Sequence, residues 1–197
     1  MALSTALENL KNSLSCITYN SVQHSHILIE EHSSSSALSK ITLTAQNGNW
    51  FSFNPDEGRK CKRLDRRSNL IIMSPLLTID NHDYHCACDA VILVQTDTKL
   101  TIIYIELKST NSGGYAKQFK STRQFVHYAL GLLEEFYEQK FTSIEERYIV
   151  FHSCKKALLN KMRTVPKTGG IGKTLPNQAH RRLVSDNAKL FLKELLA

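Results

Sequence analysis

The sequence predicts an α/β fold with a mixed central sheet flanked by helices, in the order α-β-β-β-α-β. Two apolar runs rich in β-branched residues, Ala90–Val94 and Leu100–Ile105, flank the polar turn Thr96–Lys99 and predict a β-hairpin. A long amphipathic helix follows over residues 115–140, and a further apolar run, Arg147–Ser153, follows the helix. Because crossover connections join parallel strands, that last strand should lie parallel to the second strand of the hairpin.

The segment before residue 55 predicts the first helix and several strands. Apolar residues recur at helical spacing over residues 2–14, which indicates a short amphipathic helix. Val22–Glu31 and Ile41–Ala45 read as strands on either side of the serine loop Ser33–Ser36, and together they predict an N-terminal β-hairpin elaboration. The turn signal Asn47-Gly48 before Trp50–Phe53 predicts a second hairpin.

The C-terminal part of the chain is strongly basic. The whole sequence has a net charge of +7, and residues 155–197 hold ten Lys or Arg against two acidic residues, so the rest is close to neutral. We expect one domain over residues 1–197, with 155–197 as its basic C-terminal extension. Leucine spacing predicts that this extension closes with a helix over Asn177–Leu196, with Arg181 and Arg182 in its first turn.

Composition points away from membrane and secreted classes. No apolar run approaches the roughly 20 residues that cross a bilayer. The first residues lack a basic flank followed by an apolar segment, so we expect a cytoplasmic protein. Five cysteines without regular spacing favour reduced thiols over a disulfide framework.

Two acidic residues are predicted to face each other across the central hairpin. If Thr96–Lys99 form a four-residue loop, Gln95 pairs with Leu100 and Asp89 lies opposite Glu106. Opposed carboxylates repel unless a cation lies between them, and Mg²⁺ prefers such ligands together with water and phosphate oxygens. Lys108 follows Glu106 by two residues and therefore shares its face. The set suits hydrolysis of a phosphodiester.

A solvated edge pair is the alternative for Glu106 and Lys108. The strand is apolar at both alternating sets of positions, with Ile102 and Tyr104 on one face and Ile103 and Ile105 on the other. That pattern predicts burial on both faces, where a carboxylate needs a partner.

Asp89 followed by Glu106-Leu107-Lys108 on the next strand resembles the metal-binding signature of the PD-(D/E)xK, or restriction-endonuclease-like, nuclease superfamily. Cys88 stands where the signature's name has proline, a position that varies in the superfamily. Gln118, at the start of the following helix, resembles an additional glutamine motif of some branches. The resemblance implies that Asp89 and Glu106 bind the metal, Lys108 positions or activates water, and Gln118 assists.

The same resemblance implies a Mg²⁺-dependent endonuclease, with Mn²⁺ as a substitute, that acts on DNA rather than RNA. It also implies that homodimers are possible, and that the first helix can supply a further acid, here Glu8. Glu30 and Glu31 are alternative acids. A zinc site at His82, His85, Cys86 and Cys88 is disfavoured because zinc sites usually need a second ligand pair. Gly169–Thr174 imitates a phosphate-binding loop but lacks its first glycine.

Basic residues near these elements are expected to contact nucleic acid. They comprise Arg59, Lys60, Lys62, Arg63, Arg66, Arg67, Lys117, Lys120, Arg123, Lys173, Arg181 and Arg182. Solvated basic surfaces without a role are the alternative for these positions. The alternative for the whole chain is a non-catalytic nucleic-acid-binding module on the same scaffold.

Overall fold

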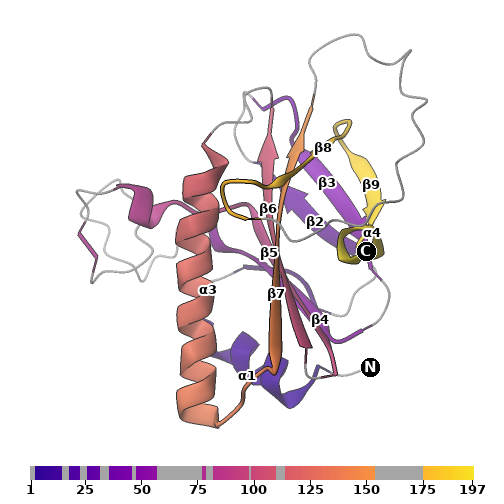
Figure 1. Cartoon of the computed structure of the whole chain (residues 1–197). Coiled ribbons are helices and arrows are strands. Elements are labelled where there is room, and N and C mark those ends of the chain that lie inside the picture. Colours follow the sequence, from indigo (N-terminus) through magenta and orange to yellow (C-terminus); the bar gives the residue numbers. More distant parts are fainter. Residues whose placement is uncertain are drawn as a thin grey trace.

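A computed structural model describes residues 3–14, 18–22, 26–31, 36–45, 48–56, 77–78, 82–97, 99–109, 114–153 and 175–197. These ranges form a mixed α/β structure with two sheets (Figure 1). The larger sheet has the order β1-β4-β5-β6-β7-β8, with β1 Thr18–Val22, β4 Trp50–Asn54, β5 Ala90–Thr96, β6 Lys99–Lys108, β7 Ser143–His152 and β8 His180–Leu183. The smaller sheet has the order β2-β3-β9, with β2 His26–Glu30, β3 Lys40–Thr44 and β9 Ala188–Phe191.

The direction of the strands confirms the predicted mixed sheet. In the larger sheet, neighbouring strands run antiparallel from β1 to β6, and β7 and β8 then continue parallel to β6. The connection from β6 to β7 is the crossover helix α3, Tyr115–Tyr137. The β2–β3 pair is antiparallel, which confirms the N-terminal hairpin.

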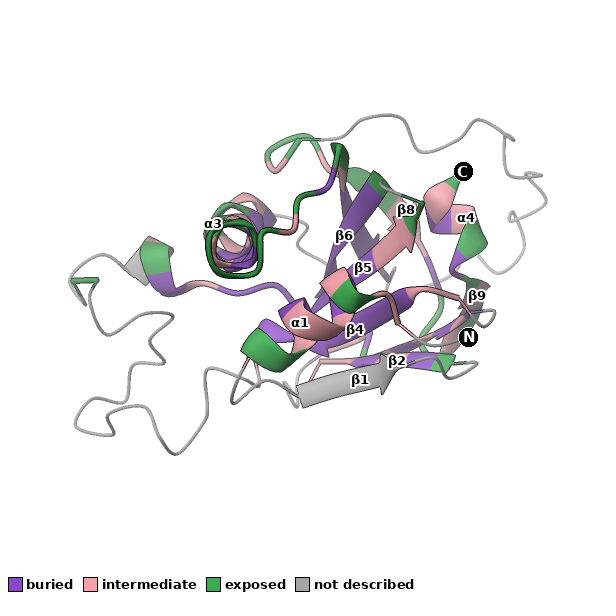
Figure 2. Cartoon of the chain, turned by 90° about the horizontal axis from the view of Figure 1, so that it is seen from below, coloured by how far each residue is buried: buried purple, intermediate pink, exposed green. Residues whose placement is uncertain are grey.

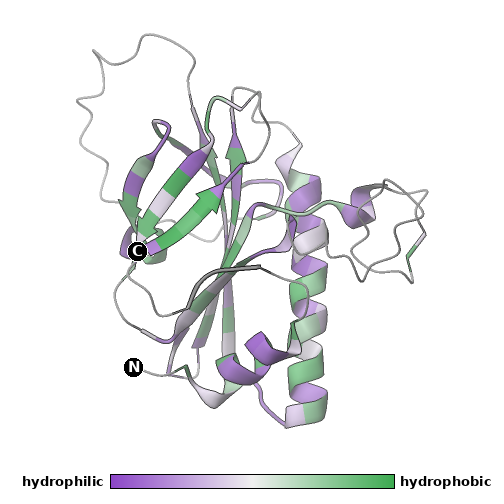
Figure 3. Ribbon diagram, turned by 180° about the vertical axis from the view of Figure 1, so that it is seen from behind, coloured by the Kyte–Doolittle hydropathy of each residue, from purple (hydrophilic) through white to green (hydrophobic). Residues whose placement is uncertain are grey.

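Different elements cover the two faces of the larger sheet. α3 packs along one face, and the first helix, α1 (Thr5–Ser13), packs against α3 and β4 (Figure 1). The smaller sheet and the four-residue C-terminal helix α4 (Lys193–Leu196) cover the other face. α3 carries hydrophobic and hydrophilic positions along its whole length (Figure 3), as expected for a helix with one side on a sheet.

Alternating residues of β6 fill both cores, as predicted. Ile102 and Tyr104 face α3, whereas Ile103 and Ile105 face the smaller sheet. All four side chains are inaccessible to solvent, and Figure 2 shows the buried strands at the centre of the molecule. A polar side chain near the end of β6 is therefore removed from water on both sides.

The second predicted hairpin is wrong. β3 and β4 belong to different sheets: β3 pairs with β2 and β9, and β4 pairs with β1 and β5. Trp50 nevertheless packs with Ile41 and Leu43 in the same core. The chain between the two strands therefore changes sheets rather than forming a ladder, and apolar packing replaces backbone pairing.

The predicted helix over Asn177–Leu196 is also wrong. The segment forms β8, β9 and the four-residue helix α4. Asn187 has a left-handed φ of 60°, and Asp186 Oδ1 accepts hydrogen bonds from the N–H groups of Ser39 (2.8 Å) and Lys40 (3.2 Å). The turn-forming sequence Ser185-Asp186-Asn187 thus interrupts the helical spacing.

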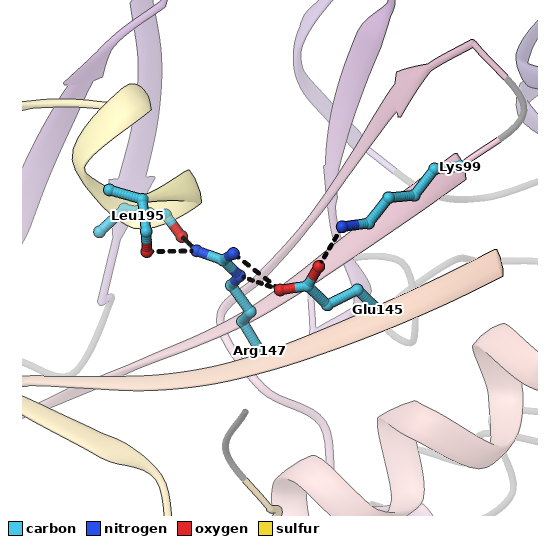
Figure 4. A network of polar contacts seen from close by, with 5 residues as sticks. Lys99, Glu145, Arg147 and Leu195 are labelled. Carbon is cyan, nitrogen blue, oxygen red and sulfur yellow. Dashed lines mark hydrogen bonds and ion pairs between the residues drawn. The ribbon is translucent and has the colours of Figure 1, made fainter. Parts of the chain in front are cut away.

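A buried arginine fastens the C-terminus to β7 (Figure 4). Arg147 Nη1 donates to the carbonyl oxygens of Leu195 (2.7 Å) and Ala197 (2.9 Å), while Nε and Nη2 donate to Glu145 Oε1. Lys99 forms an ion pair with the same glutamate. The guanidinium thus supplies hydrogen-bond donors to two carbonyl oxygens at the C-terminal end of α4, which have no partner within so short a helix.

Within the part of the chain that the structure describes, no helix is both long and apolar enough to span a membrane.

Candidate metal and phosphodiester site

The hairpin register places Asp89 opposite Glu106, as predicted. Gln95 pairs with Leu100 and Ala90 with Ile105, so the next step outward aligns the two carboxylates. The Asp89 N–H also donates to the Ile105 carbonyl oxygen at 3.1 Å. The loop is shorter than expected, because Thr96 pairs with Lys99 as well, but the register is unchanged.

Asp89 is held against the β6 backbone. Its Oδ2 accepts a hydrogen bond from the Leu107 N–H at 2.6 Å, and the residue is 8% exposed. Burial and then the negative charge of Glu106 raise the pKa of Asp89 well above its ordinary value, against the lowering effects of the Leu107 N–H and Lys108. The carboxylate is oriented, yet its ionised form remains poorly stabilised.

Glu106 is even less accessible, at 1% exposed. Burial raises its pKa to about 7, although Lys108 and Gln118 both act to lower it. Lys108 Nζ lies 2.5 Å from Glu106 Oε1. Even so, neither carboxylate oxygen receives a hydrogen bond of regular geometry from the described residues. Buried carboxylates are normally satisfied by several hydrogen bonds, so Glu106 has room for a further cationic partner.

Lys108 and Gln118 meet as predicted at the start of α3. Lys108 Nζ donates to Gln118 Oε1 at 2.9 Å while it contacts Glu106. β6 ends at Lys108 and α3 begins at Tyr115, so strand end and helix start lie at the same edge of the sheet (Figure 1). Asp89, Glu106, Lys108 and Gln118 therefore form one cluster.

The cluster suits a divalent cation. Two ionised carboxylates and one ammonium would leave one negative charge uncompensated in a buried place. Burial is the main cause of the raised pKa values of both acids. A divalent ion would reverse that charge and add a second cationic partner for the Glu106 carboxylate beside Lys108. No group of three or more His, Cys, Asp or Glu among the described residues is arranged to hold an ion alone, so water and substrate oxygens would complete the shell.

Of the two predicted alternative acids, Glu31 is the one whose charge acts on the cluster. It directly follows β2, and its negative charge helps to raise the pKa values of both Asp89 and Glu106. The loop after β2 is also tied to the end of β6, since Ser109 Oγ accepts from the Ala37 N–H at 2.8 Å. Sequence alone gave no reason to prefer Glu31 over Glu30, because this packing joins two separate sheets. Glu30 instead pairs with Lys40.

Glu8 lies at the opposite end of the molecule. It forms an ion pair with Lys11 at 2.9 Å on the surface of α1. The neighbouring Asn9 donates to Gln139, just beyond the C-terminal end of α3. α3 has 23 residues and is therefore about 35 Å long, whereas Gln118 lies in its first turns. The structure therefore does not bring Glu8 to the cluster.

The predicted nucleic-acid contacts divide into several groups. Residues 59–67 and Lys173 lie outside the described residues. Lys117 pairs with Asp83 at 2.9 Å, and Lys120 is exposed on α3. Arg123 is bound to Glu146, and Arg182 to Glu194, so both are already neutralised. Arg181 is described on β8 rather than in a helix.

Cys88, one of the residues of the disfavoured zinc site, is an ordinary part of the core. Cys88 is inaccessible to solvent, its N–H donates to Thr122 Oγ1 at 3.0 Å, and burial raises the pKa of its thiol. Cys86 and Cys88 are both free thiols. The glycine-rich loop Gly169–Thr174 lies outside the described residues.

No family model, curated protein or solved structure matches the chain.

Proposed function

We propose that this chain is a Mg²⁺-dependent nuclease of the restriction-endonuclease-like fold, which hydrolyses phosphodiester bonds in DNA. The carrying observation is the buried, opposed pair Asp89 and Glu106 with Lys108 beside it. Between α1 and β4 the chain also forms β1, β2 and β3; with these set apart, the remaining order α1, β4, β5, β6, α3, β7 supports the proposed fold, since it matches the helix, three strands, helix and strand expected from the sequence.

The chain's own groups divide the work. When bound, Mg²⁺ would activate a water molecule and neutralise charge on the phosphate. Asp89 and Glu106 would hold the ion, with the Leu107 N–H fixing the Asp89 carboxylate. Lys108 is restrained by Glu106 and Gln118, so its ammonium can direct a hydrogen bond at the attacking water or at the developing charge.

A non-catalytic nucleic-acid-binding module is the second candidate. It is favoured by the lack of a three-residue metal cluster among the described residues. It leaves unexplained why two carboxylates are buried together although burial destabilises their ionised forms and raises both pKa values. Phosphate binding requires only cationic groups. The nuclease is therefore the better supported of the two.

Cleavage assays separate the candidates. Supercoiled plasmid, linear duplex, single-stranded DNA and RNA are incubated with the protein in Mg²⁺, Mn²⁺ or EDTA. We expect metal-dependent cleavage of DNA that is lost in Asp89→Asn, Glu106→Gln and Lys108→Met. Glu134→Gln is the matched control, because Glu134 is exposed on α3 and, among the described residues, pairs with Lys140 just beyond the C-terminal end of this helix.

Metal-dependent cleavage that survives in the three site variants would reject the assignment. Nucleic-acid binding by the wild type without cleavage of any substrate would favour the binding module.

A further inference from the structure

Arg181 lies in the same row of the larger sheet as Glu106. Glu106 is in register with Val150 of β7, and Val150 is in register with Arg181 of β8. Residues in register on parallel strands project from the same face, and neighbouring strands are about 4.8 Å apart. The Arg181 backbone is thus about 10 Å from that of Glu106, and its side chain is on the α3 face, where it contacts Tyr115.

Arg181 differs from the other described arginines in its partner. Arg123, Arg147 and Arg182 each bind a glutamate. The Arg181 guanidinium instead lies over the Tyr115 ring, 5.4 Å from its centroid, and Nη2 is 3.4 Å from the tyrosine oxygen. The Tyr115 hydroxyl donates to the Asn177 carbonyl at 3.2 Å, which fixes the ring. Arg181 is therefore oriented by an aromatic group without being neutralised.

His152 lies between Arg181 and the metal cluster. It is in register with Lys108 on the adjoining strand and so projects from the same face. Its half-buried imidazole has no hydrogen-bond or ion-pair partner among the described residues. α3 begins near this end of the strands, and its first turn contains no acidic residue. The positive end of the helix dipole therefore adds to the local positive potential.

We propose that Arg181 and His152 form a second anion subsite, which binds a phosphate group next to the scissile one. The subsite rests on the proposed nuclease function and specifies how that site takes its substrate. Arg181 supplies a planar pair of donors for phosphate oxygens, and His152 supplies one further donor towards Lys108. The phosphate is either the next one along an internal stretch of strand or a terminal phosphate.

Binding measurements test the subsite apart from catalysis. The full-length Glu106→Gln protein, in EDTA, is titrated with fluorescent oligodeoxynucleotides that carry a terminal phosphate or a terminal hydroxyl, over a range of salt concentrations. Adding Arg181→Gln should weaken binding about tenfold and reduce the slope of log Kd against log salt by about one. Adding His152→Asn should weaken binding by a smaller factor.

Arg182→Gln is the matched control. Arg182 is the next residue of the same strand, but it projects from the opposite face and pairs with Glu194. It should leave affinity and salt slope unchanged. Because Arg181 is exposed, Arg181→Gln should unfold at the wild-type temperature. If it unfolds at a lower temperature, Arg181→Lys replaces it in the test. Lysine keeps the positive charge and so should keep the salt slope, but it should weaken binding because it lacks the paired donors of the guanidinium.

The outcomes separate the subsite from the nuclease. A preference for the phosphorylated oligonucleotide that Arg181→Gln removes assigns a terminal phosphate. An equal loss with both oligonucleotides assigns an internal phosphate. Equal affinities and slopes for the Arg181→Gln and Arg182→Gln proteins would overturn the subsite, even where the wild type cleaves DNA. Absence of cleavage by the wild type overturns the nuclease without affecting these binding results.

Discussion

Two glutamates on neighbouring strands of the same sheet face have opposite electrostatic environments. Burial acts to raise the pKa of Glu146 on β7, but hydrogen bonds from Arg123 (2.8 Å) and His127 (2.7 Å) lower it below its ordinary value. Burial also acts on Glu106 of β6, where Lys108 fails to compensate and the pKa rises to about 7. Glu146 belongs to a complete ion-pair network, whereas Glu106 belongs to an incomplete one.

The contrast teaches how a structural carboxylate differs from a candidate ligand. The donors around Glu146 come from α3 and match its two oxygens, and Tyr104 adds a third contact at 3.2 Å. Glu106 instead faces a second acid, Asp89, on the adjoining strand. A fold that needed only stability would not place these two charges together.

The largest expected effect is on cleavage. Glu106→Gln removes a proposed metal ligand and should lower the proposed Mg²⁺-dependent cleavage rate by about 10³-fold or more. Glu146→Gln, which changes the complete network, should keep the rate within a few-fold of wild type. Single-turnover cleavage of one DNA substrate measures both. Equal losses in the two variants would remove the functional distinction between the glutamates.

Metal affinity should depend on pH through Glu106. Mg²⁺ binds the ionised carboxylate, and the pKa of Glu106 is about 7, so affinity should rise by up to about tenfold per pH unit and per proton released as pH approaches 7. Above that pH the contribution of Glu106 should level off, while Asp89, whose pKa is also raised, adds its own proton release. Calorimetric titration with Mg²⁺ between pH 5.5 and 8.5 gives both the affinity and the proton release. A flat profile would contradict the role of Glu106 as a ligand.

Stability without metal should change with pH in the opposite direction from that of an ordinary ion pair. The folded-state pKa of Glu106 is raised above its unfolded value near 4.5, so its carboxyl has no effect below that pH and destabilises the fold as pH rises through about 7. In EDTA at pH 8, Glu106→Gln should therefore be about 3 kcal/mol more stable than wild type. Urea denaturation at pH 4.5 and pH 8 checks this. A Glu106→Gln protein that is less stable at pH 8 would contradict it.

Glu146→Gln should show the reverse sign. Its folded-state pKa is lowered, so its contribution is present above the unfolded pKa and is lost as pH falls through the folded one. We expect a loss of about 1 kcal/mol at pH 7 and a smaller loss in acid. The same urea experiment, repeated at pH 3.5, measures the difference. A gain in stability at pH 7 would show that this network is strained as well.

The smallest effect is expected at Glu8. Among the described residues, its carboxylate contacts Lys11 and Asn12 on the surface of its own helix, so Glu8→Gln should change stability by less than about 0.5 kcal/mol. Cleavage should be unaffected. A strong loss of cleavage in Glu8→Gln would mean that α1 reaches the site in the working protein.

Sequence reasoning found the hairpin register because two local signals agreed. The apolar runs on both sides of Thr96–Lys99 define the strands, and changing the loop length by a complete pair leaves Asp89 opposite Glu106. The position of Gln118 followed in the same way from the start of a strongly amphipathic helix. These features depend on residues that are close together in the chain.

The features that sequence reasoning missed depend on distant contacts. β8 and β9 are strands because β7 and β3 offer them open edges, and four-residue strands have little pattern of their own. The register of Arg181 with Glu106 and the effect of Glu31 on the cluster arise from those pairings. The helix predicted over Asn177–Leu196 rested on leucine spacing, and the turn signal Ser185-Asp186-Asn187 was given too little weight.

A crystal of the full chain grown with Mn²⁺ tests the central claim most directly, because anomalous scattering locates the ion. We expect one strong peak between Asp89 and Glu106, about 2.0–2.3 Å from an oxygen of each, and no peak at Glu146. The peak should disappear in Glu106→Gln. No peak between these two carboxylates at saturating Mn²⁺, or a peak that Glu106→Gln leaves in place, would contradict the account.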